Sequence, residues 1–210
     1  MEIGTQTLAL QMIENPLVKK LKDYKLILAS GSPRRKRFFE DLGMTFEIRL
    51  KPIDEIYPEE LKGSEISEYL SELKASAFKG LLKSREILVT SDTVVWHNNE
   101  SLAKASNKDE AAEMLHKLSN SWHEVITSVS LTTLSAQKTI SSSTKVKFSE
   151  LSDNEIDFYI KQNQPFDKAG GYGIQEWLGA IAIESIEGSY NNVVGLPTHL
   201  VYKTLMDMVD

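Results

Sequence analysis

The chain has 210 residues, of which 41% are hydrophobic and 26% charged, with a formal net charge of −6 and no cysteine. This composition is ordinary for a globular domain, and the lack of cysteine excludes disulfides and thiolate chemistry. The negative balance argues against a stable nucleic-acid partner, because such binding needs a broad positive surface. The apolar runs are shorter than the ~18 residues of a membrane span, and no secretory signal opens the chain, so we expect a cytoplasmic protein with no membrane partner.

The first predicted element is a helix over residues 5–24. Its loose apolar stripe is interrupted near Pro16. We expect an N-terminal helical extension, residues 1–24, that packs on the outside of one domain spanning residues 25–210.

A strand, a tight loop and a helix start follow at residues 26–37. The apolar run Leu26–Ala29 leads into Ser30, Gly31 and Ser32, and Pro33 takes the first helical position with Ser32 as its N-cap. Free N–H groups, the helix dipole and the cations Arg34–Arg37 would then meet at one turn, which favours a phosphate ligand. A solvated basic helix face is the alternative.

Two further segments carry candidate polar groups. A strand is predicted over Phe46–Leu50, followed by a loop that holds Asp54 and Glu55, which would ordinarily be exposed. An amphipathic helix is predicted over Ser64–Lys83. Lys74 lies next to its apolar stripe, where a lysine can turn into a cleft.

The strongest predicted strand is Ile87–Trp96, which is apolar and β-branched apart from its centre. Asp92 lies at that centre. A carboxylate in a buried strand costs several kcal/mol unless it is paired or binds a cation. We therefore favour a functional role for Asp92 over a structural capping role.

The second half alternates helices and strands. The sequence predicts a turn at Asn98-Asn99, then a helix capped by Asn107, and then a hairpin of strands 124–134 and 139–148. A capping box of Ser152 and Glu155 starts the next helix, which runs to about Lys161. A strand over 180–186 and a closing helix over 196–209 complete the chain. This interleaving predicts an α/β fold, a mixed sheet flanked by helices.

Two glycine-bearing loops, Phe166–Gln175 and Gly188–Pro197, complete the pattern. Three glycines in four residues of the first loop suggest a close backbone approach to a ligand. No zinc-binding spacing and no serine nucleophile motif is present. The basic residues and scattered carboxylates that remain are the groups that metal-assisted phosphoryl chemistry uses.

Four segments together resemble the Maf family of nucleoside triphosphate pyrophosphatases. They are Leu28–Arg35, Ser91–Val95, Phe166–Gln175 and Gly188–Pro197, in the family's order, and the similarity covers about Lys25 to Leu205. The resemblance implies an elongated, twisted Maf/ITPase-like sheet in two lobes with a central cleft. It also implies hydrolysis of a nucleoside triphosphate to the monophosphate and pyrophosphate with a divalent cation, Mg²⁺ or Mn²⁺, and often a homodimer.

The resemblance also assigns roles to residues. Asp92 would be the catalytic base and would hold the metal together with Glu55. The positions that contact phosphates are Arg35, Lys74 and Lys104, with Ser30 and Ser32 in the phosphate loop. Arg34, Thr93 and Gln175 occupy the three positions at which branches of the family differ. The residues at these positions resemble those of the branch that acts on dTTP and UTP, including modified pyrimidines. The branch that acts on 7-methyl-GTP carries Trp, Gln and Glu at the same positions.

The chain departs from the family pattern at Ala105, Gly171 and Glu176-Trp177, and Trp177 would change how the base is enclosed. Two other functions stay open, a pyrophosphatase of the 7-methyl-GTP type and a non-enzymatic nucleotide-binding regulator of cell division. Nucleic-acid binding through Arg34–Arg37 fits the acidic balance poorly.

Overall fold

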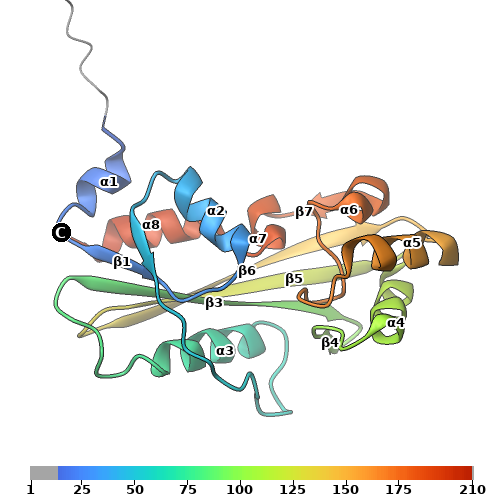
Figure 1. Ribbon diagram of the computed structural model, residues 1–210, viewed down its shortest axis with the longest axis horizontal. Coiled ribbons are helices and arrows are strands. Elements are labelled where there is room, and N and C mark those ends of the chain that lie inside the picture. Colours follow the sequence, from blue (N-terminus) through green and yellow to red (C-terminus); the bar gives the residue numbers. More distant parts are fainter. Residues whose placement is uncertain (1–13, 210) are drawn as a thin grey trace, which may run out of the picture.

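A computed structural model describes residues 14–209, which form a mixed seven-stranded sheet flanked by helices (Figure 1). The strand order is β2-β1-β3-β5-β6-β7, and β4 pairs with β3. The strands are β1 (Lys25–Leu28), β2 (Phe46–Ile48), β3 (Glu86–His97), β4 (Glu100–Leu102), β5 (Trp122–Thr132), β6 (Gln137–Phe148) and β7 (Ile183–Glu187). The predicted α/β class with a mixed sheet is confirmed.

Helices cover both faces of this sheet. They are α1 (Pro16–Lys20), α2 (Pro33–Asp41), α3 (Ser64–Ser76), α4 (Lys108–Leu118), α5 (Asp153–Asn163), α6 (Trp177–Ala182), α7 (Tyr190–Val194) and α8 (Thr198–Met208). Figure 1 shows α3 on one face and α2 and α8 on the other. None of the helices within residues 14–209 has the length and apolar character that a bilayer crossing requires.

The edge of β3 is open over a short stretch, and this opening positions the site. On one side β3 pairs continuously with β5. On the other side the parallel pairing with β1 ends at Leu28 and Val89, and the pairing with β4 begins only at Val95. Residues 90–94 therefore present backbone groups that no strand of the described chain covers on this side.

Two clusters of buried apolar residues flank this opening. Val89 belongs to a cluster with residues of α1, α2 and α8, and Val95 belongs to a cluster with residues of α4, α5 and α6. Leu17 of α1 is fully buried in the first cluster, so this short helix is part of the packed body. The open stretch of β3 lies between two separately packed regions.

Local signals placed several elements correctly. The β5–β6 hairpin, the Ser152/Glu155 capping box and the cap of α4 by Asn107 are all present. Asn98 and Asn99 both have positive φ, as the tight turn between β3 and β4 requires.

Other boundaries were wrong. Pro16 is the first residue of α1, and Asn15 is its N-cap, so Pro16 starts a helix where the sequence predicted an interruption. The part of the predicted helix that precedes residue 14 lies outside the described residues. α3 ends at Ser76 because the chain then tightens into turns that bury Phe78 against the sheet.

The C-terminal part differs in two places. Residues 180–182 end α6, because Leu178 and Ala182 are buried as helical neighbours four residues apart, and the strand starts only at Ile183. The second glycine-bearing loop contains the one-turn helix α7, which Ser189 caps. Short apolar segments fit either structure, so packing decides between them.

Candidate active site

A cavity of about 460 Å³ opens at the uncovered edge of β3. Its walls come from the turn between β1 and α2, the loop before α3, α3 itself, β3, the loop 166–175 and the end of α7. All the residues predicted for the site line it: Ser30, Ser32, Arg34, Arg35, Glu55, Lys74, Asp92, Thr93, Lys104 and Gln175. The structure thus brings together side chains that are as far as 145 positions apart in the sequence, from Ser30 to Gln175.

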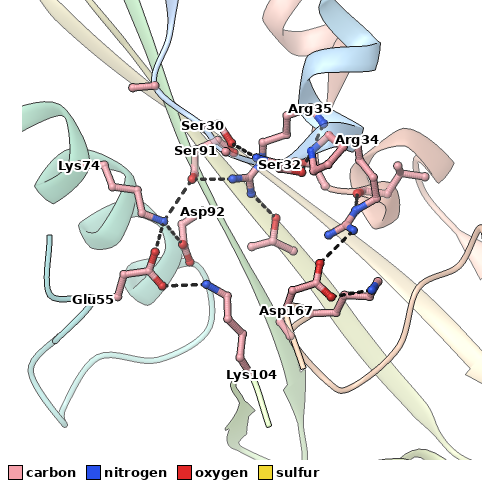
Figure 2. Close-up of a pocket in the computed structure, with 18 of the residues that line it drawn as sticks. Ser30, Ser32, Arg34, Arg35, Glu55, Lys74, Ser91, Asp92, Lys104 and Asp167 are labelled. Carbon is pink, nitrogen blue, oxygen red and sulfur yellow. Dashed lines mark hydrogen bonds and ion pairs between the residues drawn. The ribbon is translucent and has the colours of Figure 1, made fainter. Parts of the chain in front are cut away.

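Lys74 bridges the two predicted metal ligands. Its Nζ lies 2.5 Å from Asp92 Oδ1 and 2.8 Å from Glu55 Oε1 (Figure 2). Lys104 Nζ lies 3.1 Å from the other oxygen, Glu55 Oε2. Asp92 is buried, with 8% of its surface exposed, so the ammonium of Lys74 supplies the countercharge that a buried carboxylate needs.

The charge state of Glu55 follows from its neighbours. Burial raises the pKa of Glu55, but the hydrogen bond from Lys74 and the charges of Lys74 and Lys104 outweigh it and lower this pKa to about 2. Glu55 is therefore a carboxylate at neutral pH.

The donor set suits a divalent cation. Two carboxylates already converge on one positive charge, the ammonium of Lys74, and carboxylate oxygens are the ligands that Mg²⁺ and Mn²⁺ prefer. Residues 14–209 contain no group of three or more His, Cys, Asp or Glu side chains arranged for a metal. An ion held by Glu55 and Asp92 would thus complete its coordination with water and ligand oxygens, as Mg²⁺ commonly does at nucleotide sites.

Arg35 ties the turn to the open edge of β3. Its half-buried guanidinium donates to Ser91 O at 3.0 Å, to Gly195 O at 2.9 Å and to Thr93 Oγ1 at 2.9 Å. Burial lowers the pKa of Arg35, and the charge of Asp92 opposes this effect. Three of the five N–H donors of Arg35 are therefore committed to the protein, and two remain for a ligand.

The helix start behaves as predicted only in part. Ser32 caps α2 by accepting from the backbone N–H of Arg35, and Ser30 Oγ accepts from the N–H of Ser32. The expected convergence of four cations was wrong, because Lys36 and Arg37 form ion pairs with Glu40 and Asp41 one helical turn away. Successive helical residues differ by about 100° in direction, so one turn cannot aim four side chains at one point.

The hydroxyl of Thr93 belongs to a chain of hydrogen bonds that includes Thr127, Asn192 and Arg35. Thr127 Oγ1 donates its only proton to Asn192 O at 3.1 Å. When Thr127 donates to Asn192 O, the 2.9 Å contact between the two threonine hydroxyls carries the proton of Thr93, whose Oγ1 also accepts from Arg35. In this arrangement Thr93 offers the cavity a hydrogen-bond acceptor.

Part of the wall of the cavity is apolar. Val95, Val125, Tyr172, Ile174 and Val193 line it together with Gln175. Such a wall suits the flat face of an aromatic ring.

Arg34 links the two sides of the cavity. Its Nε donates to Val194 O at 3.3 Å, and its NH1 lies 3.6 Å from Asp167 Oδ2 (Figure 2). Asp167, Lys168 and Tyr172 line the cavity but were not predicted as site residues. Their place in a glycine-rich segment was the available signal, since such loops approach ligands closely.

Trp177 was expected to affect how a base is enclosed, and this was wrong. It is the first residue of α6 and does not line the cavity. Its ring packs against Phe158, with 4.8 Å between the ring centroids. The chain turns into α6 directly after Glu176, which directs Trp177 away from the cavity.

Known proteins resemble this chain along most of its length. A model of the Maf family, described as Maf-like protein, matches residues 25–208. A protein from Flavobacterium johnsoniae named dTTP/UTP pyrophosphatase is 56% identical over 92% of this chain and 100% of its own length. Proteins of the same name from Flavobacterium psychrophilum and Christiangramia forsetii are 55% and 52% identical, over 91% and 92% of this chain and 98% and 99% of their own lengths. Because the family model matches residues 25–208 and three relatives are more than 50% identical in sequence, this protein belongs to the Maf family.

Proposed function

We propose that this protein hydrolyses nucleoside triphosphates, preferentially dTTP and UTP, to the monophosphate and pyrophosphate. The observation that carries the proposal is the Glu55–Lys74–Asp92 cluster, which faces Arg34 and Arg35 in one cavity with an apolar wall. The names of the relatives support both the reaction and the bases.

Asp92 is the proposed general base. Lys74 holds its Oδ1, so Oδ2 takes a proton from a water molecule as the water oxygen attacks the α-phosphorus. The new bond forms between that oxygen and phosphorus, the bond from the α-phosphorus to the bridging oxygen breaks, and pyrophosphate leaves with the bond electrons. Lys74, Lys104 and Arg35 stabilise the charge that develops on the phosphoryl oxygens.

Glu55 and Asp92 are the proposed ligands of a divalent cation. When bound, that ion neutralises charge on the triphosphate. The two carboxylates lie on different elements, the loop before α3 and β3, and Lys74 keeps them together in its absence. Lys74 thereby preorganises the ligand pair.

The donor and acceptor pattern favours uracil and thymine. Thr93 offers an acceptor, which matches the N3–H that these bases carry and cytosine lacks. Gln175 offers both a donor and an acceptor, so it matches a ring edge that has both kinds of group. The apolar wall provides a surface for the ring.

A panel of nucleotides tests the function. Pyrophosphate release is measured for dTTP, UTP, CTP, dATP, GTP and 7-methyl-GTP with Mg²⁺ or Mn²⁺, and the fastest turnover is expected for dTTP and UTP. Asp92→Asn should reduce turnover by about 10³-fold while nucleotide binding persists, since a general base contributes about 10²–10⁴-fold. Nucleotide binding without turnover by the wild type would instead favour the regulator, and a preference for 7-methyl-GTP would reject the base assignment.

The resemblance to the family also leads us to propose a homodimer in the cytoplasm. Sedimentation equilibrium of the purified chain tests the dimer, and cell fractionation tests the location. A monomer at micromolar concentration would reject the first of these.

A further inference from the structure

We propose that Glu176 is a positioning residue that holds the loop 166–175 against α5 and so fixes the base-reading side of the cavity. Glu176 follows Gln175 directly in the chain, but its side chain turns away from the cavity and does not line it. The carboxylate instead makes three contacts, two with the loop and one with Tyr159 of α5. The inference rests on the proposed function for the identity of the ligand.

The first contact is with the start of the loop. Glu176 Oε1 lies 3.0 Å from Lys168 Nζ, which also lies 2.6 Å from Asp167 Oδ1. The side chain of Lys168 is only 10% exposed, whereas that of Asp167 is 62% exposed and that of Glu176 is 23% exposed. The ammonium of Lys168 therefore lies between two carboxylates: it donates a hydrogen bond to Asp167 and forms an ion pair with Glu176, the less exposed of the two.

The second contact joins the loop to α5. The hydroxyl of Tyr159, a fully buried side chain of α5, donates to Glu176 Oε2 and accepts from the backbone N–H of Gly173 at 3.0 Å. Burial and the neighbouring carboxylate of Glu176 raise the pKa of Tyr159, so its hydroxyl keeps its proton at neutral pH. Glu176 thus fixes the direction of a hydrogen bond that reaches the middle of the loop.

The third contact is direct packing on the backbone. A Cβ at Gly173 would lie 2.8 Å from Glu176 Cδ, closer than side chains tolerate. The carboxyl group therefore occupies the space that any larger residue at position 173 would need. A side chain at position 173 would therefore displace the carboxyl group of Glu176 from its contacts.

These contacts bear on the cavity because the loop forms one of its walls. Lys168, Tyr172 and Gln175 line the cavity, and Asp167 reaches Arg34 on the opposite side. Asp92 lies on β3 and has no contact with Glu176 among the described hydrogen bonds and ion pairs. Loosening the loop should therefore weaken recognition of the base and leave the chemical step largely unchanged.

The test uses the full chain with Glu176→Gln, Glu176→Ala and Tyr159→Phe. A glutamine keeps the shape of the side chain but loses the charge, and its amide cannot accept from both Lys168 and Tyr159. Glu184→Gln, the same chemical change at an exposed carboxylate on β7, is the matched control. The measurements are kcat and KM for UTP, dTTP and CTP, the melting temperature, and calorimetric affinity for the non-hydrolysable analogue α,β-imido-dUTP with Mg²⁺.

For Glu176→Gln we expect KM for UTP and affinity for the analogue to worsen about tenfold, the range of one lost charged hydrogen bond. The kcat should stay within about twofold, and the preference for UTP over CTP should fall about fivefold or more. Tyr159→Phe should change the same quantities by a smaller factor, and Glu184→Gln should change none of them.

Two results would overturn the inference. One is a lowered melting temperature of Glu176→Gln with unchanged KM, analogue affinity and UTP preference, which would make the role structural only. The other is an equal loss of kcat with every nucleotide. If Glu176→Ala does not fold, the measurements on Glu176→Gln and Tyr159→Phe decide whether Glu176 is a positioning residue. A wild type that binds the analogue but releases no pyrophosphate would reject the proposed hydrolysis, while the analogue affinities would still decide the role of Glu176.

Discussion

Replacing Lys74 by methionine should destabilise the protein, because it removes the ion-pair partner of the buried Asp92 carboxylate and leaves Glu55 paired with Lys104 alone. The side chains of Lys74 and Asp92 are 17% and 11% exposed, and that of Glu55 is 38% exposed. Breaking a buried ion pair by removing one partner costs about 3–5 kcal/mol. Because water screens Glu55, we take the lower end and expect a loss of about 3 kcal/mol in the free energy of unfolding.

A double-mutant cycle in urea at pH 7 measures this value. Lys74→Met, Asp92→Asn and the double variant are compared with the wild type, and Lys79→Met, an exposed lysine just beyond α3, is the control. The amide that replaces the Asp92 carboxylate carries no charge, so Lys74→Met should cost about 2 kcal/mol less in the Asp92→Asn background. All three variants that change Lys74 or Asp92 should lose pyrophosphate release.

The reasoning would be refuted by a Lys74→Met variant whose stability lies within about 0.5 kcal/mol of the wild type, the range of an ordinary surface substitution. It would also be refuted by an equal cost of Lys74→Met in both backgrounds. In either case Lys74 would not be the group that holds Asp92 as a buried carboxylate.

Three further predictions concern the metal, pH and packing. Chelation with EDTA should abolish pyrophosphate release, and Glu55→Gln should raise the Mg²⁺ concentration for half-maximal rate about tenfold; an unchanged metal requirement would remove Glu55 as a ligand. Burial lowers the pKa of His123 to about 3, so the unfolded chain takes up this proton as pH falls below about 6.5 while the folded chain does not. The wild type should therefore lose about 2 kcal/mol more than His123→Asn between pH 7 and pH 5 in urea titrations, and parallel pH slopes would contradict this. Gly179→Ala should cost about 2 kcal/mol or more, because the added Cβ would lie 1.9 Å from Ile174 O, whereas at Gly31 the nearest atom is 3.9 Å away. Equal melting temperatures of these two alanine variants would show that α6 shifts without cost.

Much of the fold followed from short-range patterns. The hairpin, the capped helices and the apolar strand around Asp92 depend on alternation and capping within a few residues, which are local properties of the chain. Boundaries failed where burial outweighed these signals, as at Phe78 and in α6. The resemblance to the Maf family supplied ten candidate site residues, and all ten line the cavity, but it did not supply Asp167, Lys168 or Tyr172, which line it too.

The directions of the side chains followed from long-range packing. Arg34 and Arg35 reach carbonyl groups about 160 positions away, at Val194 and Gly195, while Lys36 on the same helix pairs locally with Glu40. No local pattern encodes which of four successive cations meets a distant backbone, because that depends on how α2 docks against β3 and α7. The order of residues along the chain thus determined which chemical groups are present, and the docking of its elements determined which of them share one cavity.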